Sequence, residues 1–423
     1  MKNVKIGFLG LGVVGSELVN IIQESHDKIL ELFHIDLTIG KVFVRDLNKK
    51  RGTNVDLLEL TTDPNDILFD NETKIVCECV GGDGTDLTLK YVTTAFEQGK
   101  SVVMSSKKAL AFYAEEILSC ANTNNTALKY DATVGGGIPI AKIMENCFYG
   151  EDVIEVTGIV NATSNFIYTK MLNENETFDK ALKEAQINGY AENDPSEDIL
   201  GYDALFKSVI LSTFSMNKYF NPKRIVPTPF SNIDLTDMHY ANDLGYTIKP
   251  IIHMERDNDT LLYLIGPCLV KKSDIVANTF LNNNTIKIKG TASGKLGFYG
   301  QGAGNRPTAA AMFDDIVRVL KDEPTSNQTV RAYSAWKDIQ SKKSNQYLRI
   351  RTIDEVGILS KVTGVLANHN INIDKVLQRD KTQKYYDAIV FTSHTKDDSI
   401  DSLKYELEKI NAELVSVIPV LGE

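Results

Sequence analysis

Three glycines near the N-terminus follow a short apolar segment and precede a helical pattern. The apolar segment is residues 4–9, and Gly10, Gly12 and Gly15 follow it as Gly-x-Gly-x-x-Gly. From residue 16 to about residue 33, apolar residues recur at helical spacing. Gly10 suits a tight turn, Gly12 lets a pyrophosphate approach the backbone, and Gly15 lets helix and strand pack closely. The sequence therefore predicts a strand-turn-helix unit that binds dinucleotide phosphates at the helix N-terminus.

Strand and helix patterns alternate over the first 125 or so residues. Strands are expected to end at Val44, Val80 and Met104. Helices are expected near residues 85–98 and 112–125. This alternation predicts a parallel sheet covered by helices on both faces. Gly81, Ser105 and Lys107 follow strand ends, at the edge where ligands bind in such sheets.

The end of the second expected strand carries charges that bear on cofactor choice. In such folds this position meets the adenosine ribose, where an acid binds the 2′-hydroxyl and an arginine suits a 2′-phosphate. Arg45 comes first here, Asp46 follows, and residues 49–51 are Lys-Lys-Arg. The basic cluster favours NADP(H), Asp46 leaves NAD(H) open, and residues 49–51 are equally well read as a solvated charge run.

Further along the chain the pattern changes twice. The sequence predicts an α/β protein with a Rossmann dinucleotide-binding domain over residues 1–127, completed by a helix at 306–322. Residues 128–305 mix strands with long helices and predict an α+β substrate and dimerisation domain. Residues 323–345 are polar and predict a linker. Residues 346–423 read strand, helix, strand, strand, helix, strand, which predicts a complete small βαββαβ domain.

An acidic segment in the middle of the chain ends in one cation. Between Gly189 and Lys207 the carboxylates are Glu192, Asp194, Glu197, Asp198 and Asp203. A spacing of four puts Asp203 and Lys207 on one face of the helix expected there. Two interpretations remain open from these residues: a solvated acidic loop with a surface ion pair, or a pocket that holds an ammonium group beside a proton-donating lysine.

Six motifs together resemble one enzyme family. They are 10–15 (GLGVVG), 102–107 (VVMSSK), 134–140 (VGGGIPI), 161–167 (NATSNFI), 190–195 (YAENDP) and 203–207 (DALFK). In this order the chain resembles, over essentially its whole length, the homoserine dehydrogenase family in its long bacterial form with a C-terminal ACT domain. The resemblance implies reduction of L-aspartate 4-semialdehyde to L-homoserine with NADPH or NADH, on the route to threonine, methionine and isoleucine.

The resemblance also implies roles for individual residues. Lys207 matches the catalytic lysine that protonates the aldehyde oxygen, and Lys107 matches the lysine at the junction of nicotinamide and substrate. Asp203 and Glu192 match residues that hold the substrate's amino end. Further implied substrate contacts are Asp198 and Thr163. The implied cofactor contacts are Gly10, Gly12, Val13, Val14, Gly15, Arg45, Gly81, Ser105, Lys107, Gly189 and Gly302.

Three departures from the family pattern bear on its other sites. Ser106 stands where the family usually has asparagine. The resemblance implies a structural sodium ion held by carbonyl oxygens and by Asp131, which replaces a glutamate; the carbonyls are those of Val134, Gly136 and Ile138. In the ACT segment, residues 354–359 match the ligand loop except that Val356 replaces proline. Threonine is the expected effector, and a dimerisation module without ligand is the alternative.

Composition restricts partners and compartment. The net charge of −10 at pH 7 argues against nucleic acid or an anionic membrane as the main partner. No apolar run reaches the roughly 18 residues of a membrane helix. The five cysteines are scattered, which predicts buried free thiols in a cytoplasmic protein. A homodimer or homotetramer is expected. Two rival functions remain: a phosphorylating semialdehyde dehydrogenase, which needs a reactive thiolate, and a non-enzymatic amino-acid sensor.

Overall fold

The computed structural model describes residues 2–82, 84–321, 331–332, 335–339, 344–381, 385–395 and 400–422. The chain forms two compact units. The first contains Met1–Val156, Asp203–Val226 and Asn282–Tyr333, and the second contains Thr157–Tyr202, Pro227–Leu281 and Ser334–Glu423. Each unit is therefore assembled from segments that are not consecutive in the chain.

The first unit contains a six-stranded parallel sheet. Its strands are β1 (Lys2–Leu9), β2 (Ile35–Phe43), β3 (Glu59–Thr61), β4 (Thr73–Glu78), β5 (Ser101–Met104) and β6 (Leu128–Lys129). Their order, β3-β2-β1-β4-β5-β6, is that of a doubly wound dinucleotide-binding sheet, so the predicted fold class is confirmed. The two edge strands, β3 and β6, have only three and two residues, too few for a recognisable sequence pattern.

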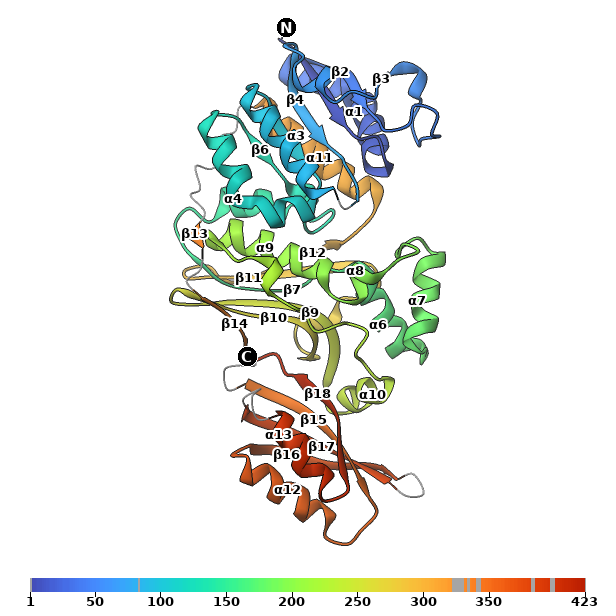
Figure 1. Cartoon of the computed structure of the whole chain (residues 1–423), viewed down its shortest axis with the longest axis vertical. Helices are drawn as coiled ribbons and strands as arrows, with labels where there is room; N and C mark the ends of the chain where they lie inside the picture. The colour runs from blue at the N-terminus through green and yellow to red at the C-terminus, as the bar shows by residue number, and fades with distance from the viewer. Residues whose placement is uncertain are drawn as a thin grey trace. The chain divides into compact units, whose positions relative to one another are not determined.

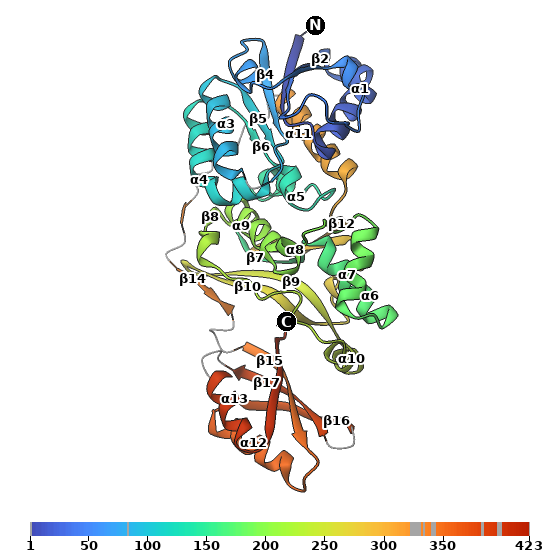
Figure 2. The same cartoon turned by 45° about the vertical axis from the view of Figure 1, so that its right-hand side comes forward.

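Helices cover both faces of this sheet. The principal ones are α1 (Val13–Phe33), α3 (Thr85–Glu97), α4 (Lys107–Thr123) and α11 (Asn305–Leu320), with shorter helices η1 (Val55–Leu57) and α2 (Asn65–Leu68). Figures 1 and 2 show α3 and α4 on one side of the sheet and α1 with α11 on the other. Met312 and Ile316 of α11 belong to the same buried cluster as Leu18 and Ile22 of α1. The expected return of this late helix to the first domain is thus confirmed.

The start of α4 was predicted too late. The helix begins at Lys107 rather than near residue 112, and its backbone is kinked at Tyr113, where φ is −127° and ψ is 26°. After two lysines, Ala109, Leu110 and Ala111 are all buried, so the first turn runs into a continuous apolar stretch. Without amphipathic periodicity, that turn cannot be recognised from the sequence pattern.

The rest of the first unit consists of shorter elements. They are η2 (Asp131–Thr133), α5 (Ile140–Cys147), the beginning of β7 (Val153–Ile159), α9 (Tyr202–Met216), β8 (Lys218–Tyr219), η3 (Pro222–Arg224), β11 (Asn283–Gly290), β12 (Gly294–Gln301) and β13 (Arg331–Ala332). Strands β11 and β12 form an antiparallel hairpin, and β13 pairs in parallel with β8.

The second unit is built on a long antiparallel hairpin, β9 (Tyr246–Asp257) with β10 (Thr260–Lys271). Strand β14 (Ala335–Asp338) pairs in parallel with the beginning of β10. The helices of this unit are α6 (Ala162–Glu174), α7 (Phe178–Ile187), α8 (Ser196–Ile199), η4 (Val276–Asn278) and α10 (Leu235–Asp243). Helix α10 packs against β9 and α6.

The C-terminal segment of this unit forms the predicted βαββαβ fold. Its elements are β15 (Ser344–Ile353), α12 (Ile358–Asn368), β16 (Asn372–Lys381), β17 (Tyr385–Thr395), α13 (Ile400–Glu408) and β18 (Ala412–Pro419). The antiparallel sheet has the order β16-β17-β15-β18, and α12 and α13 lie side by side against one of its faces (Figures 1 and 2). Their shared core contains Leu348, Val362, Leu366, Val390 and Leu403.

The expected linker at 323–345 lies largely outside the described residues, which omit 322–330, 333–334 and 340–343. Its described parts include the short strands β13 and β14. After β18 the chain returns to β10: the amide of Leu421 donates to the carbonyl of Leu269 at 2.9 Å, and Val420 forms a parallel bridge with the same residue. No helix of the described residues is long and apolar enough to cross a membrane.

Candidate active site

One buried carboxylate in the first unit is held by two lysines. Asp203 lies in the first turn of α9 and is 2% exposed. Its Oδ2 is 2.7 Å from Nζ of Lys207, one helical turn later. Its Oδ1 contacts Nζ of Lys107, the first residue of α4. The predicted placement of Asp203 and Lys207 on one helix face is confirmed, and a second cation joins them.

The electrostatics of this triad follow from burial and charge. Burial alone would raise the pKa of Asp203, but the ammonium groups of Lys107 and Lys207 outweigh it and hold the pKa below its usual range. Two cations around one anion leave a net positive charge. A net positive charge stabilises an oxygen on which negative charge develops, and an ammonium group can then protonate it.

The glycine-rich turn has the geometry that its pattern predicts. Gly10 has a φ of +99°, and a Cβ there would lie 2.5 Å from the carbonyl oxygen of Cys79. A Cβ on Gly15 would lie 2.9 Å from the carbonyl oxygen of Gly10, so α1 packs too closely on the turn for any side chain. Around Gly12 a Cβ would meet no atom within 4 Å, and Val13 at the helix start is 63% exposed. The backbone amides at the N-terminus of α1, which includes Val14, are therefore accessible to a phosphate.

The end of β2 presents a charged turn. Arg45 follows β2 and is exposed. The carboxylate of Asp46 accepts the amide of Asn48 at 2.8 Å, and Arg51 donates to the carbonyl of Lys49 at 2.7 Å and to that of Asp46. Asp46 and Arg51 therefore stabilise the turn itself. Arg45, Lys49 and Lys50 are the exposed cations at this end of the strand.

The loop positions expected to meet the cofactor differ in how tightly they are packed. A Cβ on Gly81 or Gly189 would meet no atom within 4 Å. A Cβ on Gly302 would lie 2.0 Å from the side-chain amide of Asn284, so a glycine is required at that position. Asn284 is fully buried, and its amide has no hydrogen-bond partner within the described part of the chain. Ser105 donates its hydroxyl to the carbonyl of Glu78 at 3.0 Å.

Three of the residues expected to contact the substrate, Glu192, Asp198 and Thr163, belong to the second unit. Asp198 accepts the side-chain amide of Asn161 at 2.7 Å and lies 3.1 Å from the hydroxyl of Thr163. That hydroxyl is also 2.7 Å from the carbonyl oxygen of Tyr190. Asp198 and Thr163 therefore fasten α8 and the acidic loop to the start of α6. Glu192 is exposed in that loop.

The residues expected at the sodium site fit another role. They lie between β6 and α5: Asp131, Val134, Gly136 and Ile138. Oδ1 of Asp131 accepts the amides of Ala141 at 2.8 Å and Lys142 at 3.4 Å, so it caps α5. The carbonyl of Ile138 already accepts an amide two residues on, at 2.7 Å. Two of the four expected ligands, Asp131 and Ile138, thus already accept backbone amides, and a sodium ion would compete with these hydrogen bonds.

The thiols do not support a thiolate nucleophile. All five cysteines are free, as predicted; Cys77 and Cys268 are also buried, whereas Cys79 and Cys120 are only partly buried and Cys147 is exposed. Burial raises the pKa of Cys77, Cys79, Cys120 and Cys268. A phosphorylating semialdehyde dehydrogenase needs a thiol with a lowered pKa, so these four disfavour that rival.

A buried charged cluster was not predicted from the sequence. Glu145 of α5 contacts Lys129 at 3.2 Å and Arg318 of α11, and Arg318 contacts Asp315 at 3.0 Å. Asp315 in turn accepts the amide of Asp131 at 2.8 Å. Charged residues within the apolar pattern of α11 are a signal that could have indicated it.

Buried Glu78 was also missed, although one charge in the apolar run of residues 75–80 is a visible signal.

Comparisons with known proteins agree with this geometry. A family model described as "Homoserine dehydrogenase, NAD binding domain" matches residues 10–131, one described as "Homoserine dehydrogenase" matches 139–317, and an ACT domain model matches 346–411. The homoserine dehydrogenase of Bacillus subtilis is 33% identical, covering 97% of this chain and 96% of that protein. That of Lactococcus lactis is 32% identical, covering 99% and 100%.

Solved structures agree as well. A homoserine dehydrogenase from Thiobacillus denitrificans matches with a TM-score of 0.90 at 30% identity, covering 100% of this chain and 99% of that chain. The S. aureus homoserine dehydrogenase matches with a TM-score of 0.81 at 30% identity, covering both chains fully. The chain belongs to the homoserine dehydrogenase family, the NAD(P)-dependent oxidoreductases that interconvert L-aspartate 4-semialdehyde and L-homoserine, and carries an ACT domain at its C-terminal end.

Proposed function

We propose that Asp203, Lys107 and Lys207 divide the chemistry of the family reaction among them. That reaction is the reversible, NAD(P)H-dependent reduction of L-aspartate 4-semialdehyde to L-homoserine, in threonine, methionine and isoleucine biosynthesis. The bound nicotinamide supplies a hydride to the carbonyl carbon. The Nζ of Lys207 donates a proton to the carbonyl oxygen as the C=O electron pair moves onto it, which gives the hydroxyl group.

The observation that carries this proposal is the pairing of both ammonium groups with Asp203. Asp203 fixes the direction of Lys207 from within the same helix, and it draws Lys107 toward the same carboxylate. Lys107 then adds positive charge beside the developing alkoxide, where electrostatic stabilisation contributes most. Lys107→Ala is expected to lower kcat, and Lys108→Ala, at the next position, is the matched control. Wild-type kcat in Lys107→Ala would contradict the assignment.

Glu192 is the residue that we assign to the substrate's ammonium group, together with Asp203. It is exposed in its loop, whereas Asp198 and Thr163 are engaged in holding that loop, so we assign these two a supporting part. Gln186 donates to the carbonyl of Glu192 at 3.1 Å, which restrains the backbone at that residue. A Glu192→Gln variant should raise KM for the semialdehyde more than it lowers kcat, because a binding charge is lost.

The cofactor proposal is NADP(H) in preference to NAD(H). A nicotinamide cofactor is shared by the whole family, and Arg45 supports the phosphorylated form because it is exposed at the end of β2. Its phosphates would be held by Gly10, Gly12, Val13, Val14 and Gly15. Gly81, Ser105, Lys107, Gly189 and Gly302 complete the proposed contacts. We assign the cofactor to residues 1–127 with α11, the substrate to 128–305, linker function to 323–345, and regulation to 346–423.

Regulation is proposed to act through a small amino acid at the ACT domain, with threonine as the effector. The loop at 354–359 supports this: Val356 is fully exposed, and Gly357, with a φ of +85°, caps α12. The one tryptophan of the chain, Trp336, lies in β14 before this domain and offers a fluorescence reporter. Threonine should change its emission and lower kcat in the full chain. A homodimer or homotetramer, checked by light scattering, is the proposed assembly.

A further inference from the structure

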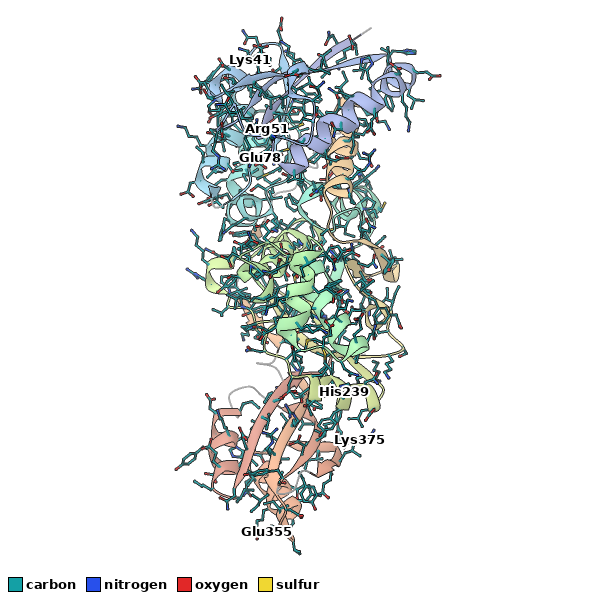
Figure 3. All side chains as sticks on the ribbon, turned by 90° about the vertical axis from the view of Figure 1, so that its right-hand side faces the viewer. Lys41, Arg51, Glu78, His239, Glu355 and Lys375 are labelled. Atoms are coloured by element: carbon teal, nitrogen blue, oxygen red, sulfur yellow. The ribbon has the colours of Figure 1, made fainter. Side chains whose placement is uncertain are left out.

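Strand β4 ends in a buried carboxylate whose hydrogen bonds, within the described residues, all come from backbone amides. Glu78 is fully buried, follows the apolar residues 75–77 of the strand, and is labelled in Figure 3. Its Oε1 accepts the amide of Val80 at 2.8 Å. Its Oε2 accepts the amides of Ser106 at 3.0 Å and Ser105 at 3.3 Å. Burial raises the pKa of Glu78 to about 7, while the three amides oppose that rise.

These amides belong to two loops at the same edge of the sheet. Val80 leads into Gly81 at the end of β4, and Ser105 and Ser106 lead from β5 into α4. Ser106 is the residue before α4, so the carboxylate lies at the N-terminus of that helix, where a negative charge is favourable. The next residue is Lys107, whose ammonium group contacts Asp203.

We propose that Glu78 is a positioning residue that fixes Lys107 for the reaction by holding the backbone from which it projects. The inference rests on the role proposed above for Lys107. A carboxylate suits this position because it offers only acceptors, and all three facing groups are donors. A hydrophobic residue of similar size would leave the part-buried amides of Val80 and Ser106 without this partner, and amides that lose their partner away from water are costly.

The position of Lys107 matters because its ammonium group must meet both Asp203 and the reacting oxygen. Two partners restrict where the ammonium group can lie, so a shift of the backbone at the start of α4 would weaken its contact with at least one of them. Ser105 donates both its amide (3.1 Å) and its hydroxyl (3.0 Å) to the main-chain carbonyl of Glu78, so β4 and β5 stay paired without the carboxylate. Loss of the carboxylate should therefore disturb Lys107 more than the sheet.

Glu78→Gln is the test variant, because it keeps the size and replaces one acceptor oxygen with a donor that faces an amide. We expect kcat to fall by roughly tenfold to a hundredfold, the scale of a misplaced catalytic group. The matched control is Glu151→Gln. Glu151 accepts the amides of Ala292 and Ser293, both at 2.8 Å, in the turn between β11 and β12. The Glu151→Gln variant should keep the wild-type kcat.

A double-mutant cycle separates positioning from a general loss of structure. Glu78→Gln in the Lys107→Ala background should leave kcat at the value of Lys107→Ala alone, because there is no longer a lysine to misplace. Independent, additive losses would overturn the inference, as would wild-type kcat in Glu78→Gln. If Lys107→Ala itself keeps wild-type kcat, the proposed function of Lys107 fails first, and the inference falls with it.

A second pair of variants removes the hydrogen bond from the other side, should Glu78→Gln fail to fold. Ser106 has a φ of −77°, which proline can adopt, so Ser106→Pro deletes the donated amide and keeps this dihedral angle. Ser106→Ala keeps the amide and controls for the hydroxyl. A lower kcat in Ser106→Pro than in Ser106→Ala supports the inference, and equal values overturn it.

Discussion

Arg349 of β15 and Asp237 of α10 form a buried ion pair. Nε of Arg349 lies 2.7 Å from Oδ1 of Asp237, Nη2 lies 3.1 Å from Oδ2, and both side chains are 1% exposed. Tyr347 and Ser416 donate their hydroxyls to the same carboxylate at 2.7 and 2.6 Å. Since α10 packs on β9 and α6, this pair connects the ACT domain to the hairpin on which the second unit is built.

Asp237→Ala should destabilise this connection strongly. The substitution leaves the buried guanidinium of Arg349 without its main counter-charge, which costs about 3–5 kcal/mol. Chemical denaturation of the full chain, followed by the emission of Trp336, measures the change. Asp243→Ala, at the other end of α10, is the comparison variant. Equal stability of the two variants would contradict a structural part for the pair.

Lys207→Ala should remove most turnover while nucleotide binding stays nearly intact. Loss of a proton donor and of a charge beside the oxygen raises the barrier by about 3–5 kcal/mol. Steady-state NADPH oxidation with L-aspartate 4-semialdehyde gives kcat, and titration of NADPH fluorescence gives the dissociation constant. Lys223→Ala controls for a lysine in the same unit. Turnover at the wild-type rate in Lys207→Ala would refute the assignment.

Arg45→Ala should shift cofactor preference toward NADH. The guanidinium gains a charge-assisted contact only when a 2′-phosphate is present, worth about 1.5–3 kcal/mol. The ratio of kcat/KM for NADPH to that for NADH is the quantity to measure. Lys50→Ala, in the same turn, serves as the control. Equal weakening with both cofactors would mark Arg45 as a general cation near the site.

Lys249→Met should stabilise the protein at neutral pH. Lys249 of β9 is almost fully buried, and burial lowers its pKa to about 7; Nζ donates to the carbonyl of Thr279 at 2.5 Å and lies 4.4 Å from the ring centroid of Phe280. The pKa of Lys249 in the folded protein lies below the unfolded value of 10.5. Lys249 therefore lowers the free energy of unfolding most below pH 7, and this destabilisation decreases up to about pH 10.

The gain from Lys249→Met should therefore be a few kcal/mol near pH 7 and fall steadily toward pH 10. Asn165 also donates to the Thr279 carbonyl, at 3.4 Å, so that oxygen keeps a partner after the substitution. Thermal unfolding of both proteins across this pH range provides the measurement. A difference that does not change with pH would show that the ammonium group is charged in the fold throughout.

Replacing sodium with choline should leave activity unchanged. Asp131 caps α5 through Oδ1, and the neighbouring carboxylates are neutralised by Lys129 and Arg318. Initial rates at constant ionic strength, with each cation as the chloride salt, provide the comparison. Sodium-dependent activity, or a sodium-dependent melting temperature, would restore Asp131 to the part of a metal ligand that the family resemblance implies.

Much of the architecture could be predicted because its signals are local. The glycine turn, the alternation of strands and helices, and the order of the ACT elements are each visible within short windows. The pairing of Asp203 with Lys207 follows from helical spacing. The contact between Asp203 and Lys107 does not follow from any local spacing, because these two residues are almost a hundred positions apart. Glu78 and Asp237 are recognisable only once their partners are known, since each binds groups distant in the chain.

Strand β10 is fastened to the chain on both sides of the ACT domain, by β14 before it and by Leu421 after it. The ACT domain is therefore a segment whose two ends are both held on the same strand, and not a domain attached at one end only. A chain cut near Ser344 would therefore lose more than the ACT domain itself, because the carbonyl of Leu269 would also lose its partner, on a strand edge that could pair with another chain. A deletion that reports cleanly on regulation would join residue 339 to residue 420 with a short linker and keep that edge covered.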